Sequence, residues 1–216
     1  MKNLLKNKKE ITAWLDKHKV KSYSLIEDVQ YGYIVNIEGD VVISDKKLTQ
    51  IPIQFGSVSG DFYCYDNKLT SLEGGPASVG GDFYCSDNKL TSLEGGPTSV
   101  GGDFACRGNK LISLKGSPTS VGENFYCNIN QLTSLLGGPA SVGGSFYCNG
   151  NQLTSLEGSP TSVGGGFYCH KNEGLEQYQN ITDFNIIKEK LLSDREKKAL
   201  SVSLDNFNLK SSVLKL

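Results

Sequence analysis

Six cysteines are the residues of this 216-residue chain whose type and spacing most directly suggest chemistry. Thiolates act as nucleophiles and metal ligands, and an even number of cysteines suggests disulfides. Each cysteine here follows a phenylalanine by two residues, so in a strand both side chains would face the same buried side. A buried free cysteine packs as a small apolar residue. We therefore predict six reduced, buried thiols, at Cys64, Cys85, Cys106, Cys127, Cys148 and Cys169.

We expect neither a metal site nor a cofactor. The chain has no C-x-x-C pair, and its two histidines, His18 and His170, are far apart in sequence. The segment GGPASVGG lacks the lysine of a phosphate-binding loop and precedes a strand-like segment rather than a helix. No Ser/His/Asp, Cys/His or paired-carboxylate arrangement stands out from the repeated background. Because the candidate catalytic groups recur at a fixed phase, we predict that the chain is not an enzyme.

The cysteines belong to a repeat of 21 residues. Asparagine, leucine, proline and valine recur at the same period, and no insertion interrupts more than a hundred residues. A fixed period of this kind is typical of a solenoid, in which stacked copies bury a shared core. The phenylalanine position comprises Phe62, Phe83, Phe104, Phe125, Phe146 and Phe167, and the asparagine position comprises Asn67, Asn88, Asn109, Asn130, Asn151 and Asn172.

Each repeat reads as one coil made of a short strand, a turn and an extended return. The run D-F-Y-C alternates polar and apolar residues, as strands do, whereas EGGPASVGG is rich in turn-forming residues. A repeat of 21 residues has no room for a strand and a full helix. The sequence therefore predicts a repeat solenoid with a single parallel β-sheet, strands about 4.8 Å apart, and a short extended or turn-containing convex side.

The flanking segments differ from the repeat and predict caps. A degenerate copy begins at Val41, and we expect the solenoid over 41–175, an N-terminal helix and strand cap over 1–40, and a C-terminal helical cap and tail over 176–216. Residues 1–20 have the apolar spacing of an amphipathic helix, and residues 22–38 are strand-like. One or two helices are expected near the C-terminus, starting at Thr182 or Asp183 and at Ser193 or Asp194.

The repeat pattern F-x-C-x-x-N-x-L-x-x-L resembles the leucine-rich repeat core, L-x-L-x-x-N-x-L-x-x-L, over residues 41 to about 175. The segment IEGDVVISDKKLTQIPIQFGSVSGDF, followed by runs of NKLTSLEGGP, is similar to a bacteriophage and prophage subgroup of that family. The resemblance implies a fold and a phage or prophage origin, but no activity. One departure is that glycine (Gly80, Gly101, Gly122) stands where the family has its first leucine, which moves the apolar role to the preceding valine.

Residues between the buried phenylalanine and cysteine positions should face outward and align in columns along the sheet. Exposed tyrosine and arginine are enriched among binding hot spots, although tyrosine also suits strands for purely structural reasons. The central column lacks its tyrosine at Ala105, where Arg107 adds a cation. This notch could anchor an acidic or aromatic group, or it could be drift in a duplicated array. The predicted binding residues are Tyr63, Tyr65, Asp82, Tyr84, Asp103, Arg107, Tyr126, Asn128, Tyr147, Tyr168 and His170.

The asparagine column has a structural interpretation. A buried amide at the corner after a strand can bond backbone N–H and C=O groups of its own and adjacent coils. On this interpretation, replacing Asn109 by leucine lowers stability without affecting binding.

Composition narrows the function classes. The formal net charge of −1 disfavours general affinity for nucleic acid or an anionic membrane. No apolar run is long enough for a signal peptide or a membrane span, so we expect the cytoplasm of a bacterial host. The leading hypothesis is a protein-binding module whose partner is a host protein, and the phage resemblance suggests inhibition of an antiphage defence. The alternative is a structural component that oligomerises through its ends or tail; nucleic-acid binding through the tyrosines and lysines is less favoured.

Overall fold

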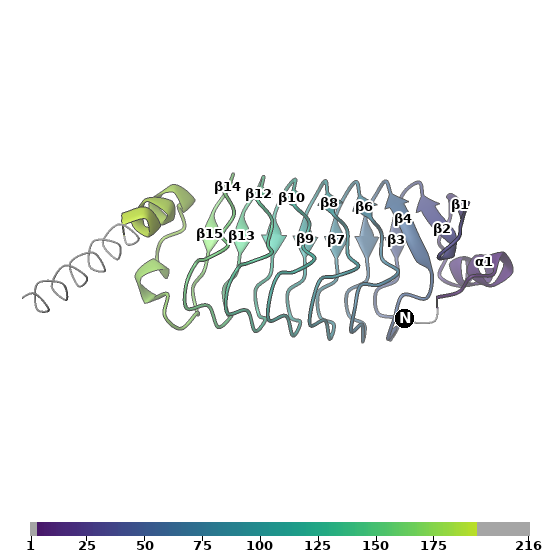
Figure 1. The fold of residues 1–216 in the computed structure, drawn as a ribbon, viewed down its shortest axis with the longest axis horizontal. Coiled ribbons are helices and arrows are strands. Elements are labelled where there is room, and N and C mark those ends of the chain that lie inside the picture. The colour runs from purple at the N-terminus through teal and green to yellow at the C-terminus, as the bar shows by residue number, and fades with distance from the viewer. Residues whose placement is uncertain (1–3, 194–216) are drawn as a thin grey trace, which may run out of the picture.

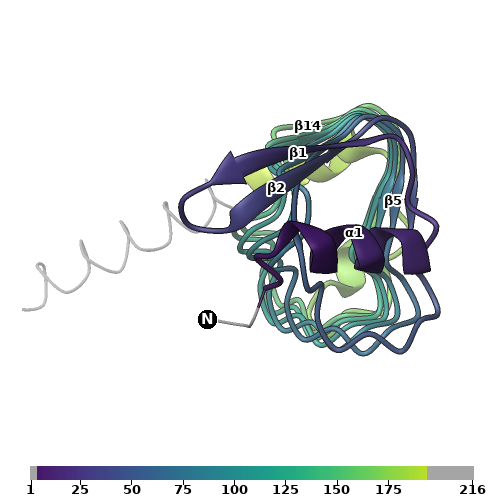
Figure 2. The ribbon, with the colours of Figure 1, turned by 90° about the vertical axis from the view of Figure 1, so that its right-hand side faces the viewer.

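The computed structural model describes residues 4–193 of the chain. They form an elongated solenoid of stacked coils (Figure 1). The N-terminal end carries helix α1 (Lys8–Lys17) and the hairpin β1 (Tyr23–Asp28) and β2 (Gly32–Ile37). At the other end lie the short helix η1 (Glu176–Tyr178) and a helix over residues 184–193. Seen end-on, α1 crosses the end of the coils, which lie nearly on top of one another (Figure 2). The predicted repeat solenoid with caps is therefore confirmed.

Two sheets run the length of the solenoid, where the sequence predicted one. The predicted sheet has seven parallel strands, and the Ser-Val pair of each extended return forms a second sheet with the N-terminal hairpin. The return pairs because its identical length in every coil brings equivalent residues into register. The first sheet comprises β3 (Val41–Val42), β5 (Phe62–Tyr63), β7 (Phe83–Tyr84), β9 (Phe104–Ala105), β11 (Phe125–Tyr126), β13 (Phe146–Tyr147) and β15 (Phe167–Tyr168). The second comprises β1, β2, β4 (Gln54–Val58), β6 (Ser78–Val79), β8 (Ser99–Val100), β10 (Ser120–Val121), β12 (Ser141–Val142) and β14 (Ser162–Val163).

A continuous column of phenylalanine rings forms the centre of the core. The ring centroids of Phe62 and Phe83 are 5.5 Å apart, and those of Phe146 and Phe167 are 5.1 Å apart. The column continues at both ends, since Phe55 of the degenerate repeat packs edge-on against Phe62, and Phe184 of the C-terminal helix stacks on Phe167. All six cysteines lie beside this column, buried and free, on the face that the sequence predicted. Each ring is held by copies of itself, so no coil has a complete core alone.

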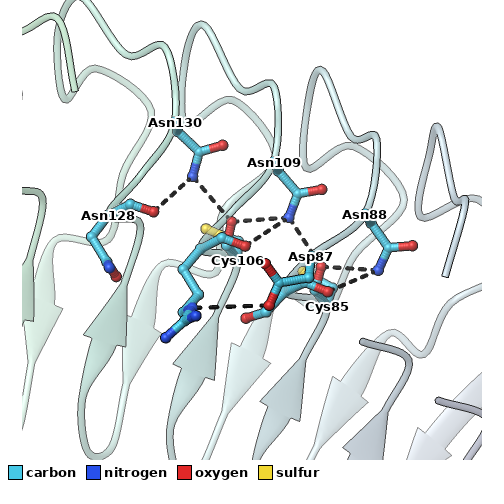
Figure 3. A network of polar contacts seen from close by, with 9 residues as sticks. Cys85, Asp87, Asn88, Cys106, Asn109, Asn128 and Asn130 are labelled. Carbon is cyan, nitrogen blue, oxygen red and sulfur yellow. Dashed lines mark hydrogen bonds and ion pairs between the residues drawn. The ribbon is translucent and has the colours of Figure 1, made fainter. Parts of the chain in front are cut away.

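The asparagine column joins each coil to its neighbour (Figure 3). The Asn109 side-chain amide donates to the carbonyl of Cys106 in its own coil and to that of Cys85 in the preceding coil, both at 3.0 Å. Its Oδ1 atom accepts the backbone N–H of Leu90 at 3.0 Å. The same bonds recur from Asn67 to Asn172. The predicted structural role of these asparagines is confirmed.

A second column of side-chain acceptors was not foreseen. One oxygen of Asp61 accepts the backbone N–H of Asp82 at 2.8 Å, and Asp82 does the same for Asp103. Asn124 and Ser145 continue the series in later coils. The column explains the second glycine of the preceding Gly-Gly pair, because a Cβ atom on Gly81 would overlap the Asp61 carboxylate, whereas a Cβ atom on Gly80 would overlap the backbone carbonyl of Ser59. Glycine is needed where coils approach this closely.

The caps follow their sequence signals with shifted boundaries. Helix α1 begins at Lys8, because the Asn7 side chain accepts the N–H of Lys9 and ends the extended segment before it. Its buried residues are Ile11 and Leu15. At the C-terminal end, Asp183 accepts the N–H of Asn185 and caps the helix, as predicted. The second predicted helix start, at Ser193 or Asp194, concerns a segment beyond the described residues.

Replacing Asn109 by leucine should lower the free energy of unfolding by at least about 3 kcal/mol, because several buried backbone groups lose their partner. Urea denaturation followed by circular dichroism measures the change. The matched control is Asn128→Ser, which introduces the serine found at the equivalent position of another repeat, Ser86. The control should shift stability by no more than about 0.5 kcal/mol. Equal stabilities of the two variants would show that the asparagine column does not hold the coils together.

Candidate functional site

The tyrosine column lies on the outer face of the seven-stranded sheet and is split into two stacks. Tyr126, Tyr147 and Tyr168 stack with centroid distances of 4.7 and 4.6 Å and nearly parallel rings. Tyr63 and Tyr84 form a looser pair at 5.1 Å, with their planes inclined by 39°. These rings are half-buried, so each presents part of its surface to solvent. The face is therefore an ordered aromatic strip with a break at Ala105.

The break is a pocket. Ala105 replaces the missing tyrosine, pairs with Tyr84 on one side and Tyr126 on the other, and is only 7% exposed. The space above it has a volume of about 400 Å³. The missing ring leaves a slot bordered by Tyr84, whose hydroxyl reaches Asp103 of the Ala105 coil, and by Tyr126. We call it the Ala105 slot; it is lined by Tyr65, Tyr84, Ser86, Asp87, Ala105, Arg107 and Tyr126.

An exposed ion pair lies at one end of the slot. The Arg107 Nε atom is 4.0 Å from an oxygen of Asp87, and the two side chains are 53% and 46% exposed. A pair this long and this exposed contributes little to stability. Arg107 therefore retains donor capacity for a carboxylate, which a guanidinium binds best with two parallel hydrogen bonds.

Aspartates at the other side of the column hold the tyrosine hydroxyls. The Tyr63 hydroxyl donates to Asp61 at 2.7 Å, and the Tyr84 hydroxyl reaches Asp103 of the next coil at 3.3 Å. The hydrogen bond to Asp61, with burial, raises the pKa of Tyr63 well above its usual range. Burial and the nearby carboxylates raise the pKa of Tyr84 in the same direction. These phenols stay neutral near pH 7, so they act as contact surface and hydrogen-bond donors rather than as phenolates.

The structure brings some predicted site residues together and separates others. Tyr65, Tyr84, Arg107 and Tyr126 line the slot, whereas His170 lies in the last coil. Asp82 and Asp103 each use one oxygen to hold the backbone of the next coil, a role that the sequence analysis missed. Tyr63, Tyr147 and Tyr168 extend the strip on either side of the slot. Asn128 is half-buried on the same face, and its Oδ1 atom is buried without a hydrogen-bond partner.

Sequence reasoning also missed three residues. Ser86 and Asp87 line the slot from the coil before Arg107, and only the strand register shows this proximity. Ile129 is 56% exposed and has a left-handed backbone, with φ of 57°. A β-branched residue rarely adopts this conformation. The signal was present in the repeat alignment, because equivalent positions carry Asp87, Gly108 and Gly150.

The cysteines contribute no reactive site. Desolvation raises the pKa of Cys64, Cys106 and their neighbours far above the usual thiol range, and it raises the pKa of Cys169 to about 11. Since the thiolate is the nucleophile and the metal ligand, these buried neutral thiols serve packing, and the Cys127 thiol also donates to the Tyr147 carbonyl at 3.4 Å. Within residues 4–193, no cluster of three His, Cys, Asp or Glu side chains could hold a metal ion. No helix in the same range is long and apolar enough to cross a membrane.

Comparisons with protein-family models, with curated proteins and with solved structures found no match to this chain. The coordinates therefore define its class: a parallel β-solenoid built from 21-residue coils, with helical caps and an interrupted tyrosine strip.

Burial of the thiols predicts a loss of stability at alkaline pH. The unfolded thiols ionise above about pH 8.5 while the folded ones remain protonated, so the unfolded state binds fewer protons and stability falls as pH rises. Each fully buried thiol contributes up to about 1.4 kcal/mol per pH unit. Urea titrations under reducing conditions between about pH 8.5 and 9.5 measure the slope, since lysine and tyrosine ionise later. Cys127→Ala should reduce this slope, and an unchanged slope would contradict the assignment.

Filling the slot should stabilise the fold. Ala105→Tyr restores the residue found at this position in the other five repeats and adds ring contacts with Tyr84 and Tyr126. We expect a gain of about 0.5–1.5 kcal/mol in the free energy of unfolding. Ala140→Tyr places the same side chain at an exposed site outside the column and serves as the control. A loss of stability in Ala105→Tyr alone would mean that the slot does not fit a tyrosine ring.

Proposed function

We propose that this chain is a non-enzymatic protein-binding module that holds its partner on the tyrosine face. The observation that carries the proposal is the ordered strip of half-exposed tyrosine rings, broken by a pocket beside a weakly paired arginine. Tyrosine provides a large contact area and a hydroxyl at a low entropic cost, since its side chain has few rotamers. Stacking restricts these rings before any partner arrives, which lowers the cost of binding further.

A second observation supports the same face. Ile129 belongs to the coil of Tyr126 and lies beside Gly108, whose N–H donates to the Ile129 carbonyl at 3.0 Å. The isoleucine keeps more than half of its surface in water, since it is 56% exposed, and its backbone conformation costs about 1–2 kcal/mol. Strain at an exposed apolar residue is a feature of binding sites. A partner that covers Ile129 would recover the apolar burial that the free protein lacks.

The proposal also assigns an origin, a compartment and a kind of partner to the chain. The repeats resemble the leucine-rich repeats of bacteriophage and prophage proteins, so we propose that the chain is phage- or prophage-encoded and acts in the cytoplasm of a bacterial host. Its partner would be a host protein, and binding would inhibit an antiphage defence. This step is supported by the sequence resemblance, which is an association and not a property of the face. The net charge of −1 and the carboxylates beside the tyrosines favour a protein partner over nucleic acid.

Affinity capture from host lysate, with mass spectrometry, tests the face. The test variant is Tyr126→Ala/Tyr147→Ala, and Ile129→Gly is a second variant that introduces the residue of the neighbouring repeats. The matched control is Ser99→Ala/Ser120→Ala, at exposed positions of the eight-stranded sheet. We expect the double tyrosine variant to lose the partner at least about 30-fold, as hot-spot residues do, and the control to retain it. Circular dichroism confirms that each variant is folded.

Retention of the partner by every variant would move the contact to the caps and contradict the proposal. Light scattering at several concentrations addresses the alternative. A mass that rises with concentration, with no host protein captured, would replace the binding module with a self-assembling structural component.

A further inference from the structure

We propose that the Ala105 slot receives one aromatic side chain of the partner, with an adjacent acidic group bound to Arg107. The inference rests on the proposed protein-binding function and specifies what the partner must present. It does not follow from exposure of the tyrosines alone, because a flat strip would accept many shapes. The slot restricts them to a planar ring with a negative charge nearby.

The width of the slot follows from the strand register. Tyr84 and Tyr126 pair with Ala105 from opposite sides, so they are two strand steps apart, or about 9.6 Å. Intact parts of the column place successive rings 4.6 to 5.1 Å apart. Two such spacings equal the separation of the strands that carry Tyr84 and Tyr126, which leaves the position of one ring between them. The Tyr84 hydroxyl, which bonds Asp103 of the Ala105 coil, leans over this position, so an entering ring packs against an inclined Tyr84. A second ring does not fit.

The walls and floor favour an aromatic ring over a polar group. Tyr84 and Tyr126 present ring faces or edges, and Ala105 contributes only a methyl group as the floor. The slot is an open depression of about 400 Å³, which has room for one side chain that remains partly exposed to solvent. A ring that enters replaces the contacts that the missing tyrosine would have made. The position above Ala105, which a tyrosine ring fills in the other five repeats, is therefore open to a ring of the partner.

The charge arrangement fixes the second requirement. Arg107 places a positive charge in this column, whereas the preceding and following repeats carry the uncharged Ser86 and Asn128 at the same position. Its ion pair with Asp87 is long at 4.0 Å, and both side chains are about half exposed. A carboxylate from the partner would form shorter, charge-assisted bonds with Arg107 than Asp87 does. An acidic group near the aromatic residue of the partner therefore complements the slot.

Phenylacetate is a suitable probe, because it combines a ring and a carboxylate. Its affinity for the full chain is measured by ligand-observed NMR titration, and the shift of the Ala105 methyl signal reports the location. Cyclohexylacetate keeps the charge and removes the planar ring, and phenylacetamide keeps the ring and removes the charge. We expect cyclohexylacetate to bind at least tenfold more weakly than phenylacetate, and phenylacetamide at least threefold more weakly.

Two variants that use residues of the chain's own repeats complete the test. Ala105→Tyr should abolish phenylacetate binding while remaining folded, and Ala140→Tyr should bind it as the wild type does. Arg107→Asn introduces the residue of the next repeat and should reduce phenylacetate affinity at least threefold without changing that of phenylacetamide. Three results would each overturn the inference: no phenylacetate binding, equal binding by Ala105→Tyr, or equal affinity for cyclohexylacetate.

Different results would contradict the proposed slot and the proposed protein-binding face. A host protein that Ala105→Tyr still captures, but Tyr126→Ala/Tyr147→Ala loses, would support the face and overturn the slot. Phenylacetate binding at Ala105, in a chain whose captured partner all face variants retain, would show that the slot binds aromatic acids, but it would overturn both the face as the protein contact and the partner side chain as the occupant of the slot.

Discussion

The structure depends on the hydrogen bonds that the asparagine amides make across the boundary between coils. Each of these side chains bonds its own coil and the coil before it, so two neighbours are correctly placed only when they have the same length. An inserted residue would displace the amide from one of its carbonyls and leave buried backbone groups unpaired. The 21-residue period is therefore a physical requirement, and the phenylalanine stack, the buried thiols and both sheets follow from it.

The same constraint explains why changes of sequence are concentrated on the outer face. Inward positions must repeat, because each buried ring packs against its own copies. Outward positions are held in register by the backbone and are free to vary without changing the fold. Ala105, Arg107 and Ile129 are such variations, and they lie in two successive coils. The regular core thus carries an outer face whose sequence departs from the repeat, and these departures lie at the candidate site.

The repeat pattern predicted the solenoid, the inward cysteines, the asparagine column and the outward tyrosines, because each depends only on the alternation within a strand and on the period. It did not predict the second sheet. Ser78 and Val79 stand in a segment rich in glycine and proline, where local propensity indicates a turn, and only pairing with neighbouring coils makes them a strand. From sequence alone, the Asp82 carboxylate was interpreted as a binding group on the outer face for a similar reason. The backbone N–H that it accepts is 21 residues away. The notch at Ala105 was visible in the sequence, but its lining by Ser86 and Asp87 required the register between coils.

The aspartate column has a consequence for how such a molecule changes in length. Its acceptors pass from carboxylate (Asp103) to amide (Asn124) to hydroxyl (Ser145), and at Gly166 the series ends where the chain bridges to Asp183 of the C-terminal cap. The internal junctions share one geometry although their acceptor groups differ, whereas the last junction is specific to the cap. A gene duplication or deletion of one whole copy would leave both caps satisfied and would move the slot along the array by a single strand spacing, about 4.8 Å. Unequal recombination between copies can therefore move a binding feature along the solenoid in steps of one coil, without changing the residues that form it.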